Sequence, residues 1–256
     1  MTMRRPLSCS SSRDSTTRRR CSRRPSGRSA RAKDGILAHS GRLAPSARIT
    51  AAALRQAGVV LADDLDQLIT MGELLGTGRS PSGHRLHVVT NSGGEANLIA
   101  DVADDAGLEL PAMSDQARDS LADRWPSFHV ANPLDPWGVD AYQEIYPEAI
   151  RAAVAEPGDI VVVAQDQQTT SGAYERQLGL DLVNYLAQAT AGSTKLPILL
   201  SPTSQDPDPA VTERCPQAGI ALLRGVPPAL HAVARLAARP APAPAAASWT
   251  QSSCLR

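Results

Sequence analysis

The sequence predicts an α/β protein with a doubly wound parallel sheet, preceded by a truncated second α/β unit. Short aliphatic runs alternate with segments long enough to form helices, and each parallel crossover needs a helix to return the chain. Apolar residues make up 42% of the chain but aromatic residues only 3%, so the core must be packed mainly with Leu, Val, Ile and Ala. Such a core is typical of a parallel sheet covered by helices on both faces.

The truncated unit is predicted within residues 27–78. Segment 46–58 carries apolar residues at helical spacing and ends at Gly58, a suitable stop. Residues 59–64, VVLADD, predict a short buried strand, and residues 63–78 predict a second helix that ends at its glycines. No further strand is present to complete a sheet, so this unit is incomplete.

A complete doubly wound domain is predicted for residues 84–238, after a turn-rich connector at residues 76–83. Helices are expected on both faces of its sheet, and ligands of such sheets gather at the carboxyl ends of the strands. Six apolar runs are expected to form strands: LHVVTN (86–91), LELPAM (108–113), HVANPL (129–134), DIVVVAQ (159–165), LPILLSP (196–202) and IALLRG (220–225).

The net charge of zero conceals a strong asymmetry along the chain. Residues 1–33 carry 11 Lys and Arg against one acid, Asp14, which leaves 15 basic and 25 acidic residues in the remainder. The basic segment lacks interleaved aromatic residues and any motif that places a helix in a groove, so nucleic-acid binding is not expected. Residues 1–26 are expected to be a disordered Ser/Arg-rich segment, and residues 239–256 a Pro/Ala-rich tail.

Neither a membrane span nor a secretory signal is predicted, because no run approaches 18 apolar residues and no apolar stretch follows the N-terminal arginines. A cytoplasmic location is therefore expected. The four cysteines lack CxxC or CxxH spacing, which argues against a zinc site and a disulfide framework and favours structural or incidental roles. They are Cys9, Cys21, Cys215 and Cys254.

A tight turn follows the first strand of the second domain, and a helix is predicted to begin within it. Its glycines would let backbone N–H groups at a helix N-terminus approach a phosphate, with the helix dipole adding attraction. Glycines are equally common where a strand turns sharply into a helix, and neither a Rossmann fingerprint nor a Walker lysine is present. Spacing alone leaves both interpretations open. The turn consists of Asn91, Ser92, Gly93 and Gly94.

A second polar loop, VANPLDPWG at residues 130–138, places Asn132 and Asp135 at the end of a predicted strand. Doubly wound sheets bind ligands at this edge, although Asx turns explain such residues equally well. The polar run QDQQTTSG, residues 165–172, lies at the same edge, and no residue in it has an assigned role.

His39 lies in LAHSGRLAPS, on a predicted loop ahead of a helix. A neutral imidazole can accept a phosphoryl group on a ring nitrogen when a carboxylate orients it and helix N-termini receive the phosphate. An exposed loop histidine fits the same spacing. The other histidines show no metal-site spacing, so they are interpreted as structural or exposed and no metal site is predicted. They are His84, His87, His129 and His231.

Three stretches together resemble the NDP-forming acyl-CoA synthetases, relatives of succinyl-CoA synthetase. Gly27-Arg28-Ser29 stands nine residues ahead of His39, as in the family pattern, where the histidine lies in Ser-His-Thr-Gly. The resemblance runs from Gly27 to Ala238, with its motifs in the family order. The stretches are residues 26–75, VVTNSGGEANLIADVADDAGLEL (88–110) and VANPLDPWG (130–138).

The resemblance implies a ligase that couples acyl-CoA formation to ATP hydrolysis or synthesis through an acyl phosphate and a phosphohistidine on a mobile loop. It implies that His39 is this histidine and that the turn at Asn91–Gly94 faces the phosphorylated loop. Residues 27–78 are then the C-terminal remnant of a succinyl-CoA ligase-like flavodoxin domain, and residues 84–238 a complete flavodoxin-like domain. Helix dipoles around a histidine suit phosphoryl transfer, which depends mainly on positioning and electrostatics.

The chain departs from the family in what it lacks. Ala38-His39-Ser40-Gly41 replaces Ser-His-Thr-Gly, and Pro45 replaces a small residue. The CoA-binding domain, the carboxylate expected to orient the histidine and the ATP-grasp domain have no counterpart. We therefore expect this chain alone to bind no cofactor. ATP or ADP, Mg and CoA are implied for the complete enzyme, with CoA-binding and ATP-grasp domains or subunits supplied in trans.

Residues 1–26 match nothing in the family, which suggests a gene fragment produced by a frameshift or a misplaced start. A split enzyme with separate CoA-binding and ATP-grasp chains is a second hypothesis. A non-catalytic flavodoxin-like interaction module is the third. The acyl substrate, the nucleotide and the oligomeric state are not predicted by the sequence.

Overall fold

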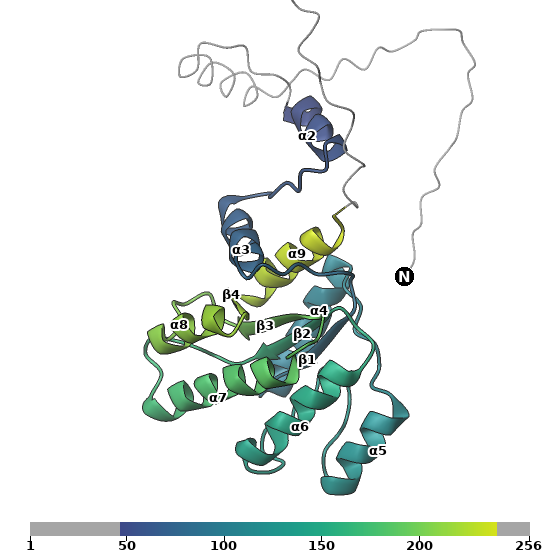
Figure 1. Cartoon of the computed structure of the whole chain (residues 1–256), viewed down its shortest axis with the longest axis vertical. Coiled ribbons are helices and arrows are strands. Elements are labelled where there is room, and N and C mark those ends of the chain that lie inside the picture. The colour runs from purple at the N-terminus through teal and green to yellow at the C-terminus, as the bar shows by residue number, and fades with distance from the viewer. Residues whose placement is uncertain (1–46, 240–256) are drawn as a thin grey trace, which may run out of the picture. The chain divides into compact units, whose positions relative to one another are not determined.

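The computed structural model describes residues 47–239, which form an α/β fold as predicted (Figure 1). The chain divides into two compact units, residues 1–50 and 51–256. Of the first unit the structure describes only residues 47–50, the start of α2. The elements are α2 (Ala47–Gln56), α3 (Leu65–Gly76), β1 (Leu86–Val89), α4 (Gly93–Ala106), α5 (Asp115–Arg124), α6 (Tyr142–Ala155), β2 (Ile160–Ala164), α7 (Ala173–Ala189), β3 (Leu196–Ser201), α8 (Pro209–Gln217), β4 (Ala221–Arg224) and α9 (Val226–Ala237).

The four strands form one parallel sheet in the order β1-β2-β3-β4. Val162 lies opposite Val88 on one side and Ile198 on the other, so the aliphatic runs are in register across the sheet. Helices α5 to α8 cover one face, and α3, α4 and α9 cover the other. The predicted doubly wound architecture is confirmed.

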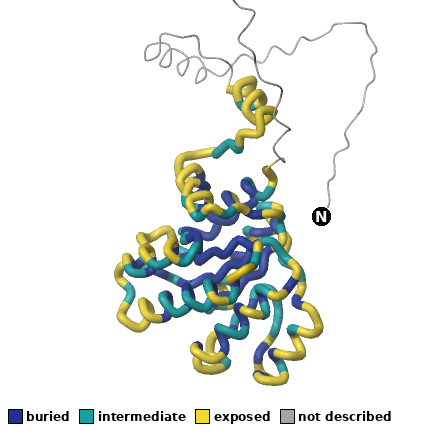
Figure 2. Tube along the Cα trace, viewed as in Figure 1, coloured by how far each residue is buried: buried dark blue, intermediate teal, exposed yellow. Residues whose placement is uncertain are grey.

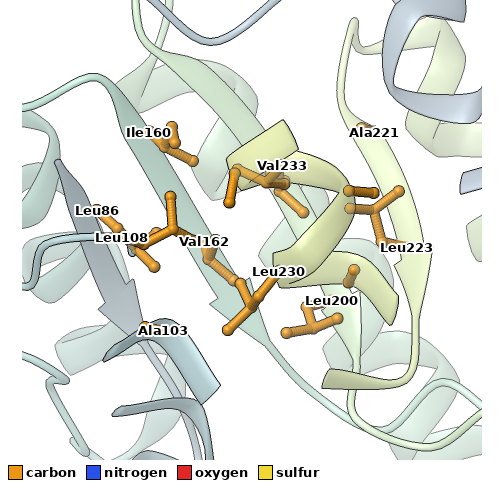
Figure 3. Packing of buried hydrophobic residues seen from close by; sticks show 14 of the residues in the cluster. Leu86, Ala103, Leu108, Ile160, Val162, Leu200, Ala221, Leu223, Leu230 and Val233 are labelled. Atoms are coloured by element: carbon orange, nitrogen blue, oxygen red, sulfur yellow. The ribbon is translucent and has the colours of Figure 1, made fainter. Parts of the chain in front are cut away.

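Alternation along the strands divides the core into two layers. On β2, Ile160 and Val162 face the α4 and α9 side, while Val161 and Val163 face the α6 and α7 side. Figure 3 shows Leu230 and Val233 of α9 packed over the sheet in the first of these layers. Because both faces are covered, the strands consist of almost continuous apolar residues.

Two of the predicted strands are wrong, because residues 108–113 and 129–134 contribute only isolated bridges. Glu109 pairs with Arg85 and Leu134 pairs with Val89, both along the outer edge of β1. Between these bridges the Val88 N–H and the Leu86 carbonyl bond to the Asn132 side chain instead of to the backbone of another strand. The other four predicted strands are present.

The strand predicted at residues 59–64 is also absent. Val60 and Ala62 pack against the core, but the backbone of residues 59–64 does not pair with any strand among residues 47–239. Asp64 instead caps α3, since its side chain accepts a 2.7 Å hydrogen bond from the backbone N–H of Gln67. Gly58, with φ of 78°, ends α2 as predicted.

Within residues 47–239, no helix has the length and apolar character needed to cross a membrane. Cys215 is a free, fully buried thiol in α8, and burial raises its pKa to about 12. A thiol of this kind is inert at neutral pH, which agrees with the predicted structural role. The other three cysteines lie outside the described residues.

Candidate functional site

The candidate site lies where the chain changes direction at the carboxyl end of β1. From β1 the chain passes through α4 to Glu109 on the outer edge of β1, and later returns to β2 on the inner side. This winding is flavodoxin-like, and ligands of such sheets bind at the point where successive connections diverge. The turn predicted at Asn91–Gly94 occupies this point and leads directly into α4.

Helix α4 begins as an anion-binding helix would. Ser92 is its N-cap, and the side chain accepts a hydrogen bond from the Glu95 backbone N–H at 3.5 Å. Gly93 and Gly94 are exposed, and the first backbone N–H groups of a helix have no acceptor within it. The backbone therefore presents donors at the positive end of the helix dipole.

Carboxylates surround this helix start. Glu95 accepts a 2.8 Å hydrogen bond from the Thr90 hydroxyl. Asp135 lies close to Gly93, since a Cβ placed on that glycine would be 3.7 Å from Asp135 Oδ2. Asp166, after β2, has one buried carboxylate oxygen without a partner among the described residues. The helix end that attracts anions is thus close to three acidic side chains.

Burial is the main cause that raises the pKa of Glu95 above its ordinary value. The Thr90 hydroxyl opposes this by favouring the charged form, and the negative charges of Asp166 and Asp135 raise the pKa further. Protonation of Glu95 therefore occurs at higher pH than for an exposed glutamate, and it removes one negative charge from the start of α4.

Replacing Glu95 with glutamine is expected to strengthen sulfate binding at α4 about fivefold, because one negative charge is removed from the first turn of the helix that supplies the backbone donors. Sulfate is a suitable probe because it does not titrate between pH 5 and 8. Isothermal titration calorimetry measures the affinity. Asp101→Asn, which makes the same charge change at an exposed position further along α4, should leave the affinity unchanged. Equal affinities for wild type and Glu95→Gln would contradict the prediction.

Asn91 is held toward β2. Its side-chain amide donates to Gln165 Oε1 at 2.6 Å, and its own Oδ1 is buried without a partner among the described residues. The buried Tyr146 hydroxyl donates to the Thr90 carbonyl at 3.2 Å. These contacts from β2 and α6 fix the end of β1, and the turn therefore has a rigid base.

The structure separates the two residues predicted in the 130–138 loop. Asp135 lies beside α4 and accepts a hydrogen bond from the Trp137 backbone N–H at 3.3 Å, as the Asx-turn interpretation expects. The Asn132 side chain instead points to the edge of β1. Its oxygen accepts from the Val88 N–H at 3.0 Å, and its amide donates to the Leu86 and Pro111 carbonyls, each at 2.9 Å. The Asn132 side chain thus makes the hydrogen bonds to β1 that the backbone of a neighbouring strand would make.

His39, with the Gly27-Arg28-Ser29 motif, lies outside the described residues. Of the other histidines, His87 is the unexpected one: it lies on β1, is 1% exposed, and neither ring nitrogen has a hydrogen-bond partner among the described residues. Residues 47–239 contain no cluster of three or more His, Cys, Asp or Glu side chains that could hold a metal ion.

Sequence reasoning missed Thr90, Tyr146 and Gln165 as parts of this site. Gln165 and Asp166 belong to the polar run after β2, whose position at the sheet edge was the available signal. No sequence pattern predicts a role for Tyr146 in the site, because its position in the apolar pattern of its helix identifies it only as a core residue. A cavity of about 710 Å³ lies beside β4, the strand furthest from β1, and Arg224 in its wall already pairs with Asp206 at 3.0 Å.

Comparison with known proteins relates the chain to CoA ligases. A family model described as the succinyl-CoA ligase like flavodoxin domain matches residues 25–75. The alpha subunit of ADP-forming acetate–CoA ligase II from Pyrococcus furiosus is 30% identical over 139 residues, covering 54% of this chain and 30% of the relative. The alpha subunit of ligase I from the same organism is 32% identical over 132 residues, covering 51% and 28%. The chain thus spans less than a third of these relatives.

Solved structures share the fold. The dinucleotide forming acetyl-coenzyme A synthetase 1 of Ca. Korarchaeum cryptofilum, in complex with phosphate and ADP, aligns with a TM-score of 0.63 at 23% identity, over 82% of this chain and 44% of that one. PH0766 from Pyrococcus horikoshii aligns with a TM-score of 0.61 at 22% identity, over 76% and 44%. The resemblance to the NDP-forming acyl-CoA synthetases is confirmed.

Proposed function

We propose that this chain, which resembles a partial subunit of an ADP-forming acid–CoA ligase, carries the phosphohistidine of that reaction and one helix terminus that receives the phosphate. His39 is the proposed phosphoryl carrier. The backbone N–H groups of Gly93 and Gly94 are proposed to donate hydrogen bonds to the phosphate. Residues 27–78 and 84–238 are proposed as the remnant and the complete flavodoxin-like domain.

The observation that carries this proposal is the family match over residues 25–75, a range that includes His39. In the sequence, His39 also stands at the family's spacing from Gly27-Arg28-Ser29. The geometry of α4 supports it independently, because an N-capped helix with two exposed glycines at a flavodoxin-like switch point is an anion-binding arrangement.

The chemistry asked of these residues is limited. In the ATP-forming direction His39 attacks the phosphorus of an acyl phosphate, so that an N–P bond forms, the P–O bond to the acyl group breaks and a carboxylate leaves. The proton on the attacking ring passes to a base, and the phosphoryl group then moves to ADP. Backbone dipoles stabilise the transferring charge without covalent participation.

Nucleotide, Mg and CoA are proposed to be held by other domains or subunits. Two arginines near the carboxyl edge are occupied by carboxylates: Arg176 pairs with Asp208 at 2.8 Å, and Arg224 pairs with Asp206. No described acidic cluster fits a metal ion. The two arginines are thus not free for the phosphates of ATP, and the described carboxylates do not fit its metal ion. We therefore propose that ATP-grasp and CoA-binding parts act in trans. A cytoplasmic location is also part of the proposal.

A second function is favoured by one observation, the three carboxylates around α4. Glu95, Asp135 and Asp166 place negative charge where a phosphohistidine would dock, and like charges repel. A non-catalytic flavodoxin-like interaction module requires no phosphate at this helix. Sulfate binding by the wild type, measured as above, distinguishes the two functions.

The phosphocarrier function predicts a labelling result. Incubation with an ATP-grasp subunit of an ADP-forming ligase and [γ-³²P]ATP should place acid-labile, alkali-stable phosphate on the wild type, and His39→Asn should reduce this label at least 100-fold. His129→Asn is the matched control, because His129 is exposed and is not part of the motif, and it should be labelled like the wild type. Equal labelling of wild type and His39→Asn, or no label on either, would count against the phosphocarrier.

A further inference from the structure

Strand β4 has an outer edge with which no described residue pairs. It is the last strand of the sheet and pairs only with β3, whereas the outer edge of β1 carries two isolated bridges. Gly225, directly after β4, donates its backbone N–H to the Ser201 carbonyl of β3 at 2.8 Å. Because the direction of hydrogen bonding alternates along a parallel strand, the N–H and C=O groups of Leu222 and Arg224 point outward. Among residues 47–239 these groups have no backbone partner.

A mostly apolar cavity of about 710 Å³ lies along this edge, between α8 and the end of α3. The strand side of its wall is formed by Ile220, Ala221 and Leu222. Figure 2 shows the buried strands and the exposed outer sides of the helices beside them. Unpaired backbone groups next to an apolar groove can accept an extended segment as an added strand. The remaining apolar wall consists of three prolines at and before α8: Pro207, Pro209 and Pro216.

The chain itself has a segment within reach of this cavity. Helix α9 begins directly after β4 and extends about 18 Å back over the sheet. Residues 240–247, PAPAPAAA, can span at most about 26–29 Å, which is enough to return along the length of α9. The cavity beside β4 is therefore accessible to residues 248–256, SWTQSSCLR.

Residues 248–256 are suited to strand pairing, unlike the spacer before them. The spacer has proline at positions 240, 242 and 244, and proline has no N–H to donate to a neighbouring strand. Residues 248–256 contain no proline. In an extended conformation, period-two alternation places Trp249 and Leu255 on the same face, where both can contact the prolines of the cavity.

Charge also favours this occupant. Arg224 in the cavity wall already pairs with Asp206 at 3.0 Å and with Glu73 at 3.5 Å. Glu213, in the same wall, has no ion-pair partner within residues 47–239. Arg256 is the only charged side chain among residues 240–256, and its charge is opposite to that of Glu213.

The handedness of crossovers determines the direction of pairing. Helix α8 packs on one face of the sheet and α9 on the other. A strand added beyond β4 and parallel to it would need a left-handed crossover through α9, which is rare. We propose that residues 248–256 pair with the outer edge of β4 as an antiparallel fifth strand and close the cavity. The proposal does not depend on phosphate transfer.

Hydrogen–deuterium exchange of the full chain, followed by NMR, tests the pairing. The backbone amides of Leu222 and Arg224 should be protected in the wild type. Thr250→Pro/Gln251→Pro removes two adjacent N–H groups from the added strand, so exchange at both amides should accelerate about tenfold or more. The matched control is Ala245→Pro/Ala246→Pro, which places the same change in the Pro/Ala spacer and should exchange like the wild type. Fast exchange in the wild type, or equal protection in Thr250→Pro/Gln251→Pro, would overturn the proposal.

Crosslinking through Cys254 gives a second readout that identifies the occupant. In a Cys9→Ser/Cys21→Ser background, Glu213→Cys places a thiol in the cavity wall, and a short bismaleimide should join it to Cys254 of the same molecule. Asp119→Cys makes the same change at an exposed position of α5 and should give no crosslink to Cys254. A crosslink between two molecules, together with concentration-dependent dimerisation, would assign the edge to a second copy and overturn the proposal.

Discussion

Replacing Asn132 with alanine is expected to lower the free energy of unfolding by about 3–5 kcal/mol, since a buried polar group left without its partner costs about 1–3 kcal/mol. The Asn132 amide makes three hydrogen bonds of 2.9–3.0 Å, two of them to the backbone of β1. The β1 residues concerned, Leu86 and Val88, are fully buried, so the variant leaves a buried N–H and a buried carbonyl without this partner. The third bond, to Pro111, holds the neighbouring segment.

Urea unfolding followed by far-UV circular dichroism at pH 7 measures this effect. Asn132→Asp distinguishes the accepted hydrogen bond from the donated ones. Its carboxylate still accepts from the Val88 N–H, but it cannot donate to the Leu86 and Pro111 carbonyls. A loss of unfolding free energy of similar size is therefore expected. Asn97→Ala is the control, because Asn97 is exposed on α4, and it should change stability by less than about 0.5 kcal/mol. A loss below about 1 kcal/mol for Asn132→Ala would show that the amide does not support the strand edge.

Acid is expected to destabilise the fold through His87, by about 2–3 kcal/mol between pH 7 and pH 4. Burial, aided by the positive charge of Lys195, lowers the pKa of His87 to about 4, although Glu156 acts in the opposite direction. The unfolded chain keeps the ordinary value near 6.5. The stability contributed by the neutral ring is therefore complete above pH 6.5 and is lost as the pH falls from 6.5 toward 4.

The measurement is the pH dependence of unfolding free energy for matched variants. His87→Phe keeps a ring in the site but cannot take up a proton, so the difference between wild type and variant should shift by about 2–3 kcal/mol in favour of the variant on going from pH 7 to pH 4. His129→Asn should follow the wild-type curve, since His129 is exposed. Parallel curves for wild type and His87→Phe would contradict the assignment.

The sheet was largely predictable because its strands are short aliphatic runs bounded by turns. The failures have physical causes that periodicity does not contain. Residues 108–113 and 129–134 are apolar enough for strands, but each contributes one bridge, because the Asn132 side chain occupies the β1 backbone groups between the two bridges. Residues 59–64 have a suitable composition, yet a strand forms only where another strand is available to pair with it.

The candidate site was predicted in part. The turn at Asn91–Gly94 was found because glycines between a strand and a helix form a local signal. The partners of that turn come from 50 to 75 residues away in sequence, as with Tyr146 and Gln165, and no local pattern identifies them. Asn132 and Asp135 look equivalent in the sequence, but only the structure shows that one supports β1 and the other approaches α4.

The side chain of Asn132 also has a consequence for how the protein behaves at high concentration. An unpaired strand edge is a template on which another molecule can add a strand, and proteins avoid aggregation by blocking such edges. On β1 the Asn132 amide and the flanking bridges occupy this template. At the opposite margin of the sheet, β4 has only four residues and ends in the charged Arg224. Loss of the amide would therefore leave part of the β1 edge free to pair with another molecule as well as weaken the fold.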